Sequence, residues 1–148
     1  MSRTRILFVC SGNTCRSPMA EAIARSLVGD SRMSFSSAGS SAVEGLPASG
    51  PALAEMTRRG LSLDSHRSRG LSEELLAEAD LVLAMEDVHR RRLRRFSASE
   101  GKVMLLSEWA GETDSGLGVD DPFGGSEDDY ERTADRLAAL LSAGLGRR

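Results

Sequence analysis

The segment from Ile6 to Pro18 constrains the fold of this chain more than any other part of the sequence. It opens on a continuous apolar run, Ile6–Cys10, which is followed at once by the turn-forming residues Ser11–Asn13. A short apolar run bounded by turn residues is typical of a strand buried on both faces of a parallel sheet. Pro18 then stands at a natural first position of a helix. The sequence therefore predicts a buried strand, a tight loop and a helix in direct succession.

The rest of the chain alternates strand and helix patterns. Further strands are expected at Met33–Ser36, which Ala38-Gly39 should break, at Asp80–Met85 and at Lys102–Leu106. Two helices are expected in the first half of the chain, one at Met19–Leu27 ended by Gly29 and one around Leu53 and Met56 that Gly60 stops. A third should include Val88, Leu93 and Phe96. A fourth should begin at the capping box of Ser126 and Asp129, with one face made of Tyr130, Ala134, Leu137 and Leu141. This alternation indicates a parallel α/β sheet with right-handed crossovers, in which active sites lie at the carboxyl ends of the strands.

Length and composition narrow the class of protein. The 148 residues, 40% of them hydrophobic, suffice for one packed core, so residues 1–148 are expected to form a single domain. A net charge of -3 and an aromatic content of 4% argue against a protein that binds nucleic acid. No apolar run approaches the roughly 20 residues of a membrane span, and a cytoplasmic protein is the default expectation. Cys10 and Cys15 form no C-x-x-C pair and no His/Cys cluster exists, so no metal site is expected.

The loop Cys10–Pro18 carries the most specific chemistry in the sequence. Small residues and Gly12 allow the backbone to curl so that successive N–H groups point inward, and such a nest at a helix N-terminus binds an anion. Arg16 adds a planar fork of donors that matches phosphate oxygens. This positive field favours the thiolate form of Cys10, which would be a nucleophile for phosphoryl transfer. The spacing C-x5-R alone is weak evidence, and the alternative is that Cys10 is a small buried residue at a strand end.

The stretch Val9–Glu21 resembles the signature of the low-molecular-weight protein tyrosine phosphatase family, and a second family element, an Asp-Pro pair far downstream, is present as Asp121-Pro122. The resemblance covers essentially the whole chain. Ser37 and His66 fall where the family has a supporting serine and histidine. Within the family, the chain is most similar to the bacterial protein arginine phosphatases, whose marks are a threonine within the loop and a phenylalanine after Asp-Pro, here Thr14 and Phe123. Ser11 departs from the Thr or Leu that other members often carry.

The resemblance implies an α/β fold, a single-domain three-layer sandwich with a four-stranded parallel sheet and helices on both faces. It implies a protein phosphatase that works through a phosphocysteine intermediate on phosphorylated protein substrates, without a metal or other cofactor. Phosphoarginine is the favoured substrate, and phosphotyrosine is the close alternative. We expect neither a nucleic acid nor a membrane as partner, and a phosphate or similar anion in the loop.

The expected roles follow from the same comparison. Cys10 is the nucleophile, Arg16 binds the phosphoryl group, and Asp121 is the general acid and then the general base, with Asp120 as its rival. The substrate-binding residues are expected to be Ser11, Gly12, Asn13, Thr14, Cys15, Ser17 and Phe123. Ser17 would also donate to the Cys10 sulfur, and Asn13 would hold the loop through a left-handed backbone with support from Ser37 and His66.

Several alternatives remain open at this point. A thioredoxin-coupled arsenate reductase on the same fold would need further cysteines, and none follows Cys15. A non-enzymatic anion-binding module would not need both Cys10 and Asp121. Peroxide could convert Cys10 and Cys15 into a protective disulfide. The cluster Arg90–Arg95 is expected to be a solvated helix face rather than a nucleic-acid patch, although it could help dock an acidic protein substrate. His89, beside these arginines on the same solvated helix, is assigned no role.

Overall fold

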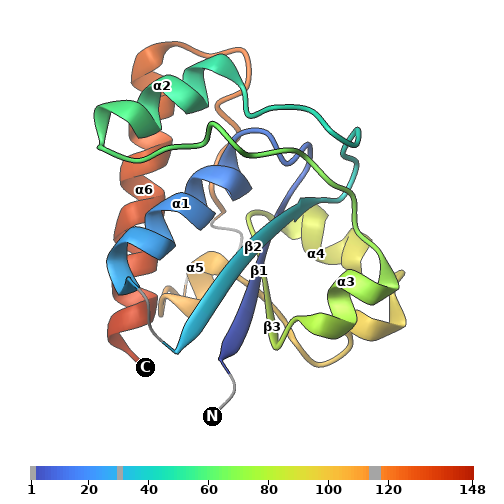
Figure 1. Ribbon diagram of the computed structural model, residues 1–148. Coiled ribbons are helices and arrows are strands. Elements are labelled where there is room, and N and C mark those ends of the chain that lie inside the picture. The colour runs from blue at the N-terminus through green and yellow to red at the C-terminus, as the bar shows by residue number, and fades with distance from the viewer. Residues whose placement is uncertain (1–2, 30–31, 114–117) are drawn as a thin grey trace.

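A four-stranded parallel sheet forms the centre of the molecule in the computed structural model, which describes residues 3–29, 32–113 and 118–148 (Figure 1). Its strands are β1 (Thr4–Cys10), β2 (Met33–Gly39), β3 (Leu81–Ala84) and β4 (Val103–Leu105), in the order β2-β1-β3-β4. The sheet has helices on both faces, so the predicted α/β architecture is confirmed. All four predicted strands exist, within a few residues of their expected bounds.

The two helical layers bury opposite sides of β1. The first layer holds α1 (Arg16–Val28), α2 (Gly50–Arg58), α5 (Leu106–Trp109) and α6 (Glu127–Gly146) and shares a core with Ile6 and Phe8. The second holds α3 (Glu73–Glu78), α4 (Asp87–Leu93) and the short 3-10 helix η1 (Ser97–Ser99) and packs on Leu7 and Val9. Because successive strand residues point to opposite faces, an apolar run without alternation is what a strand between two layers requires.

Helix boundaries follow the local signals where those signals were strong. Ser126 caps α6 in a capping box with Asp129, as predicted, and Tyr130, Ala134, Leu137 and Leu141 are buried. Gly29 ends α1 with a left-handed φ of 61°, which a residue without a Cβ adopts at little cost.

Three expectations about local structure are wrong. Ala38-Gly39 does not break β2, because Val9 pairs with Ala38 and Cys10 with Gly39 to the end of the parallel ladder. Pro18 is the third residue of α1, not the first. The first N–H groups of a helix have no intrahelical acceptor, so proline is tolerated throughout that turn. Phe96 lies beyond the end of α4 and precedes η1.

Three segments that lead into helices lie at one end of the sheet. In Figure 1 the loop from β1 into α1 lies at the carboxyl end of the strands, close to the beginnings of α2 and α4. The start of β1 and the end of α6 lie at the opposite end (Figure 1). Within the described ranges, none of the helices combines the length and the apolar character that crossing a bilayer would require.

Candidate active site

The loop between β1 and α1 has its backbone carbonyls held from outside. The carbonyls of Cys10, Ser11, Asn13 and Thr14 accept hydrogen bonds of 2.6–3.0 Å from, in turn, the N–H of Ser40, the N–H of Ser41, Nε2 of His66 and the N–H of Ser49. Across the part of the chain that the structure describes, the N–H groups of residues 11–15 donate to no protein acceptor. Carbonyls directed outward leave N–H groups available within the loop, which is the arrangement that binds an anion.

Asn13 shapes this loop from within. Its φ of 56° is the only positive value among the described non-glycine residues, and its side chain is fully buried. The side-chain Nδ2 donates to Ser17 Oγ and to Ser37 Oγ, both at 2.9 Å, and Oδ1 accepts from the N–H of Arg69 at 3.0 Å. With His66 bound to its carbonyl, Asn13 is held by four groups. The structure therefore brings Ser37 and His66 to Asn13, as the sequence suggested.

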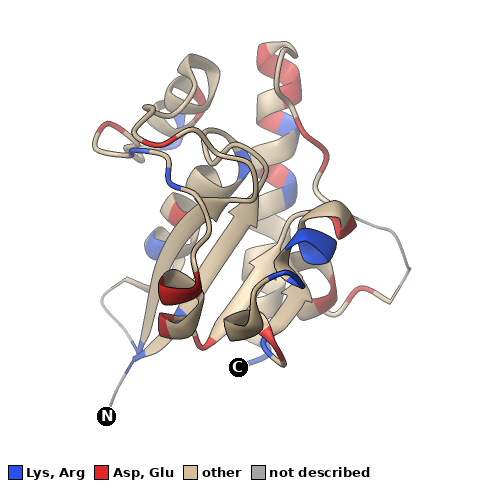
Figure 2. Ribbon diagram, turned by 90° about the vertical axis from the view of Figure 1, so that its right-hand side faces the viewer, with Lys and Arg blue, Asp and Glu red and all other residues tan. Residues whose placement is uncertain are grey.

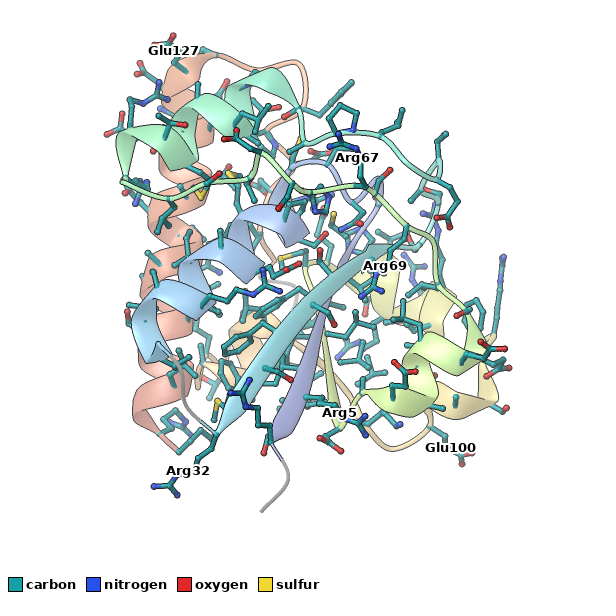
Figure 3. The ribbon with its side chains drawn as sticks, in the orientation of Figure 1. Arg5, Arg32, Arg67, Arg69, Glu100 and Glu127 are labelled. Carbon is teal, nitrogen blue, oxygen red and sulfur yellow. The ribbon has the colours of Figure 1, made fainter. Side chains whose placement is uncertain are left out.

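The second layer of contacts extends beyond the residues expected from the sequence. Ser37 Oγ donates to Glu21 Oε1 at 2.8 Å. Arg69, labelled in Figure 3 beside the end of β2, donates from Nε to the carbonyl of Ser37 at 3.0 Å. The side chains and carbonyls of Asn13 and Ser37 are therefore tied to α1, β2 or the segment after α2, which restricts the shape of the loop.

Gly39 permits the close approach of β2 to the loop. A Cβ at this position would stand 2.5 Å from the carbonyl oxygen of Ser11 and 3.0 Å from the nitrogen of Asn13. Both atoms belong to the backbone, so neither can move without changing the loop. From the sequence, Gly39 was expected only to break the strand, and this role was missed.

Cys10 lies at the base of the loop with its thiol buried. Its Sγ is 2.9 Å from Ser17 Oγ. Because Ser17 Oγ already accepts from Asn13 Nδ2, the Ser17 proton is free to donate to the Cys10 sulfur. This hydrogen bond fixes the position of the Cys10 sulfur at the base of the loop.

Arg16 joins the loop to two other segments. The residue is 2% exposed. Its Nη1 donates to the carboxylate of Glu86, between β3 and α4, and to the carbonyl of Val119 at 2.8 Å, while Nη2 lies 3.6 Å from Asp121 Oδ2. These contacts set the orientation of a side chain that would otherwise be flexible. Glu86 was missed from the sequence, although its position just after a parallel strand is where site residues are expected.

Asp121 and Phe123 lie on the loop that precedes α6. Asp121 Oδ1 accepts the N–H of Phe123 at 3.0 Å, and its side chain remains 47% exposed. Arg16 contacts the carboxylate of Asp121 and not that of its neighbour Asp120 in the described chain. Phe123 itself is 75% exposed. Asp121 is therefore the better placed of the two acids to act on a group bound by Arg16.

Thr14 and Cys15 complete the loop. Thr14 is half-buried, and its hydroxyl lies 3.6 Å from where a Cβ on Gly12 would stand. Cys15 is buried, with Sγ 3.3 Å from Ser49 Oγ and 3.4 Å from the hydroxyl of Tyr130. Burial and the neighbouring Cys15 raise the pKa of Tyr130 to about 12. Cys10 and Cys15 are free thiols, and a disulfide between them stays a prediction.

His89 does not lie on a solvated face, contrary to expectation. It is fully buried, its Nδ1 accepts the N–H of Glu86 at 3.0 Å, and its Nε2 lies 2.9 Å from Ser11 Oγ. Since Nδ1 accepts, Nε2 carries the proton and donates to Ser11. Burial, followed by the charges of Arg16 and Arg92, lowers the pKa of His89 to about 4. The neutral imidazole thus ties the loop to Glu86, which holds Arg16.

Acid should destabilise the protein through His89. A histidine with a folded-state pKa of about 4 and an ordinary value of 6.5 binds its proton more tightly when unfolded. Its contribution to the free energy of unfolding is present above pH 6.5 and is lost as the pH falls from 6.5 toward 4. In His89→Gln, the melting temperature should decrease less over this range than in the wild type, as measured by calorimetry. Equal decreases in both proteins would contradict this assignment.

The chain matches one protein family over nearly its full length. The profile described as "Low molecular weight phosphotyrosine protein phosphatase" matches residues 5–145. The protein-arginine-phosphatase of Bacillus subtilis (strain 168) is 42% identical over 139 residues, covering 92% of this chain and 91% of that protein. The low molecular weight protein-tyrosine-phosphatase PtpB of Staphylococcus epidermidis is 38% identical over 137 residues, covering 93% and 94%.

Solved structures show the same likeness. The low molecular weight protein tyrosine phosphatase of T. tengcongensis superposes with a TM-score of 0.91 at 38% identity, covering 97% of this chain and 99% of that one. The YwlE arginine phosphatase, solved as a cysteine-to-serine mutant with a phosphorylated active site serine, gives a TM-score of 0.90 at 39% identity, covering 97% and 94%. Similarity to arginine phosphatases and to tyrosine phosphatases is therefore about equal.

Proposed function

Because the chain belongs to the low molecular weight phosphotyrosine protein phosphatase family, we propose that it hydrolyses phosphoarginine in proteins through a phosphocysteine formed on Cys10. The observation that carries this proposal is the buried Arg16 guanidinium, which lies against Asp121 at the mouth of a loop that has Cys10 at its base. Nucleophile, anion-binding group and acid thus come from segments far apart in the sequence and meet at one end of the sheet.

The first chemical step would transfer the phosphoryl group to Cys10. The thiolate attacks phosphorus, an S–P bond forms, and the bond from phosphorus to the arginine nitrogen breaks with its electron pair going to nitrogen. Asp121, in its acid form, gives that nitrogen a proton. Arg16 and the loop N–H groups bind the equatorial oxygens, where charge is greatest in the transition state.

The second step would return the enzyme to its starting state. Asp121, now a carboxylate, takes a proton from water as the water oxygen attacks phosphorus. The S–P bond breaks with its electrons returning to Cys10, and inorganic phosphate leaves. The Ser17 hydroxyl, 2.9 Å from Sγ, stabilises the departing thiolate. In the YwlE mutant the active site serine is itself phosphorylated, which supports phosphoryl transfer to a side chain of the enzyme in this family.

Thr14 and the arginine phosphatase relatives support phosphoarginine over phosphotyrosine. An aromatic ring gains by burying apolar area, whereas a guanidinium is charged and rich in N–H donors. The Thr14 hydroxyl makes the wall of the loop polar. Ionised Asp121 can pair with the guanidinium during binding, take a proton from it, and return that proton to the nitrogen as the P–N bond breaks. The B. subtilis relative is named as a protein-arginine-phosphatase. Phosphotyrosine remains the second candidate because PtpB is named as a tyrosine phosphatase at similar identity.

One assay distinguishes the two substrates. Matched peptides that carry phosphoarginine or phosphotyrosine at the same position would be compared by kcat/KM under the same conditions. We expect a clear preference for phosphoarginine. A preference for phosphotyrosine would overturn the substrate assignment, and turnover of neither peptide nor of an aryl phosphate would favour an anion-binding module.

Replacement of Thr14 by isoleucine should move the preference toward phosphotyrosine. The larger apolar side chain would pack on an aromatic ring and remove the hydroxyl from the wall of the loop. The change in the ratio of the two kcat/KM values should correspond to about 1–3 kcal/mol, the size of one pocket contact. Thr14→Val, which removes the hydroxyl but keeps the shape, is the matched control for polarity. If both activities fall in the same ratio, Thr14 does not select the substrate.

A further inference from the structure

Helix α4 presents a row of arginines whose electrostatic surroundings differ. Arg90 pairs with Asp87 at 2.7 Å and with Glu108 at 2.9 Å, and Arg91 lies 3.3 Å from Asp87. Arg92 contacts only hydroxyls, Ser40 Oγ at 3.1 Å and Ser41 Oγ at 3.4 Å. Within the described ranges, neither Arg92 nor the exposed Arg95 contacts a carboxylate. Arg90 is thus neutralised by two carboxylates, whereas Arg91 has one longer contact and an exposed side chain. The charges of Arg92 and Arg95 remain available.

Arg92 lies next to the catalytic loop. The two serines that its guanidinium contacts also hold the loop, because the N–H groups of Ser40 and Ser41 donate to the carbonyls of Cys10 and Ser11. The positive charge of Arg92 also contributes to the lowered pKa of His89, whose Nε2 donates to Ser11 Oγ. Figure 2 shows the arginines of α4 as a broad blue stretch of ribbon.

Helical spacing groups three of these cations. Residues 88, 91, 92 and 95 follow the pattern i, i+3, i+4, i+7, so their side chains share one stripe of the helix surface and of the turn that continues it. Val88 stands at the end of the stripe nearest Glu86, and Arg95 at the far end. We name Arg91, Arg92 and Arg95 the α4 rim.

We propose that the α4 rim binds an acidic segment of the protein substrate that flanks the phosphorylated residue. This inference rests on the proposed function, because it deepens the substrate of the same site. The partner is inferred from charge complementarity between the positive rim and an acidic segment. This attraction must be local, because the chain as a whole has a net charge of -3 and would repel an acidic protein. At physiological ionic strength, charges act over only about 8 Å, so a local cluster beside the loop can still attract carboxylates.

Two peptides test the rim. Both would carry phosphoarginine at the same position, one with Asp and Glu on either side and the other with Asn and Gln. At low salt, wild-type kcat/KM should be about 3- to 10-fold higher for the acidic peptide, mainly through a lower KM, and the ratio should fall toward one in high salt. Arg92→Gln and the double variant Arg91→Gln/Arg95→Gln should each reduce the ratio at low salt.

Two further variants distinguish an effect of the rim's own positive charge from an effect of the net charge of the whole chain. Arg92→Lys keeps the charge and should preserve most of the ratio. Arg32→Gln removes one positive charge at the opposite end of the sheet from the loop, where Figure 3 labels Arg32, and should leave the ratio unchanged. An equal loss in Arg32→Gln and Arg92→Gln would overturn the docking surface in favour of net charge alone.

The remaining outcomes distinguish the rim from the catalytic assignment. Turnover of an aryl phosphate and of the neutral peptide should be the same in Arg91→Gln/Arg95→Gln as in the wild type, because neither arginine contacts the loop or the serines that hold it in the described structure. In Arg92→Gln, a loss common to both peptides cancels in their ratio. Equal wild-type kcat/KM on both peptides overturns the rim while the proposed function stands. If only phosphotyrosine peptides are hydrolysed, the substrate proposal fails and the same acidic and neutral pair with phosphotyrosine tests the rim. Inhibition by a single-stranded oligonucleotide that depends on Arg92, without an acidic-peptide preference, would assign the rim to nucleic acid instead.

Discussion

Replacement of Cys10 by serine should abolish turnover while the site continues to bind phosphate. A serine hydroxyl is scarcely ionised at neutral pH, so it attacks phosphorus far more slowly than a thiolate. A phosphoserine also releases phosphate slowly, because an alkoxide is a poorer leaving group than a thiolate, and the YwlE mutant retains its phosphorylated serine. The loop N–H groups and Arg16, which bind the anion, remain in place. We expect kcat to fall by roughly 10⁴-fold or more, the scale seen when a covalent nucleophile is removed. An aryl phosphate assay measures the loss, and calorimetric titration with inorganic phosphate measures the binding that is retained.

Cys15→Ser is the matched control for this experiment. It makes the same chemical change five positions further along, at a sulfur that contacts Ser49 and Tyr130 rather than Ser17. Most of the turnover should survive, because the backbone N–H of residue 15 is unchanged. Retained turnover in a folded Cys10→Ser variant would remove the phosphocysteine mechanism.

Loss of the acid should slow the reaction in a way that depends on the leaving group. Asp121→Asn keeps the size of the side chain and its acceptor for the Phe123 N–H but cannot supply a proton. The expected loss is roughly 10²–10⁴-fold, the usual contribution of a general acid. Poor leaving groups, which need protonation as they depart, should show the larger loss. Initial rates on a series of aryl phosphates with leaving groups of different pKa give the comparison.

Asp120→Asn separates the two neighbouring acids. It removes one carboxylate from the same loop, but one that does not contact Arg16 in the described structure. Its effect should be small and independent of the leaving group. If Asp121→Asn slows good and poor leaving groups equally, Asp121 acts in another way than as a proton donor.

The sequence was sufficient for features that depend on a few consecutive residues. The apolar run before Ser11 predicted a strand buried on both faces, and burial of Ile6 through Val9 agrees. The Ser126 capping box and Gly29 predicted helix ends because capping involves residues at most a turn apart. The small residues and Gly12 between Cys10 and Arg16 predicted a curled loop, and anion binding by this loop stays a prediction. The groups that hold the loop from outside, Ser40, Ser41, His66 and Ser49, came only with the tertiary structure.

Predictions about helix α4 were less successful because its environment is set by distant segments. A run of arginines predicts a solvated face, yet His89, directly before this run, is fully buried and contacts Ser11. Helical periodicity indicates which residues share a face, but not what covers that face. Only the crossover from β3 brings the start of α4 beside the loop.

Contacts between residues far apart in the chain were decided by the tertiary structure alone. Glu86 and Asp121 meet Arg16 across 70 and 105 positions, and Arg69 reaches Asn13 across 56. No local pattern encodes such a pairing, because each partner is a common polar residue on a loop. They meet because parallel strands place their carboxyl ends at one edge of the sheet, where burial makes every unpaired polar group costly. The same packing explains why residue 39 is a glycine. In the folded protein, β2 lies so close to Ser11 that there is no space for a Cβ at this position.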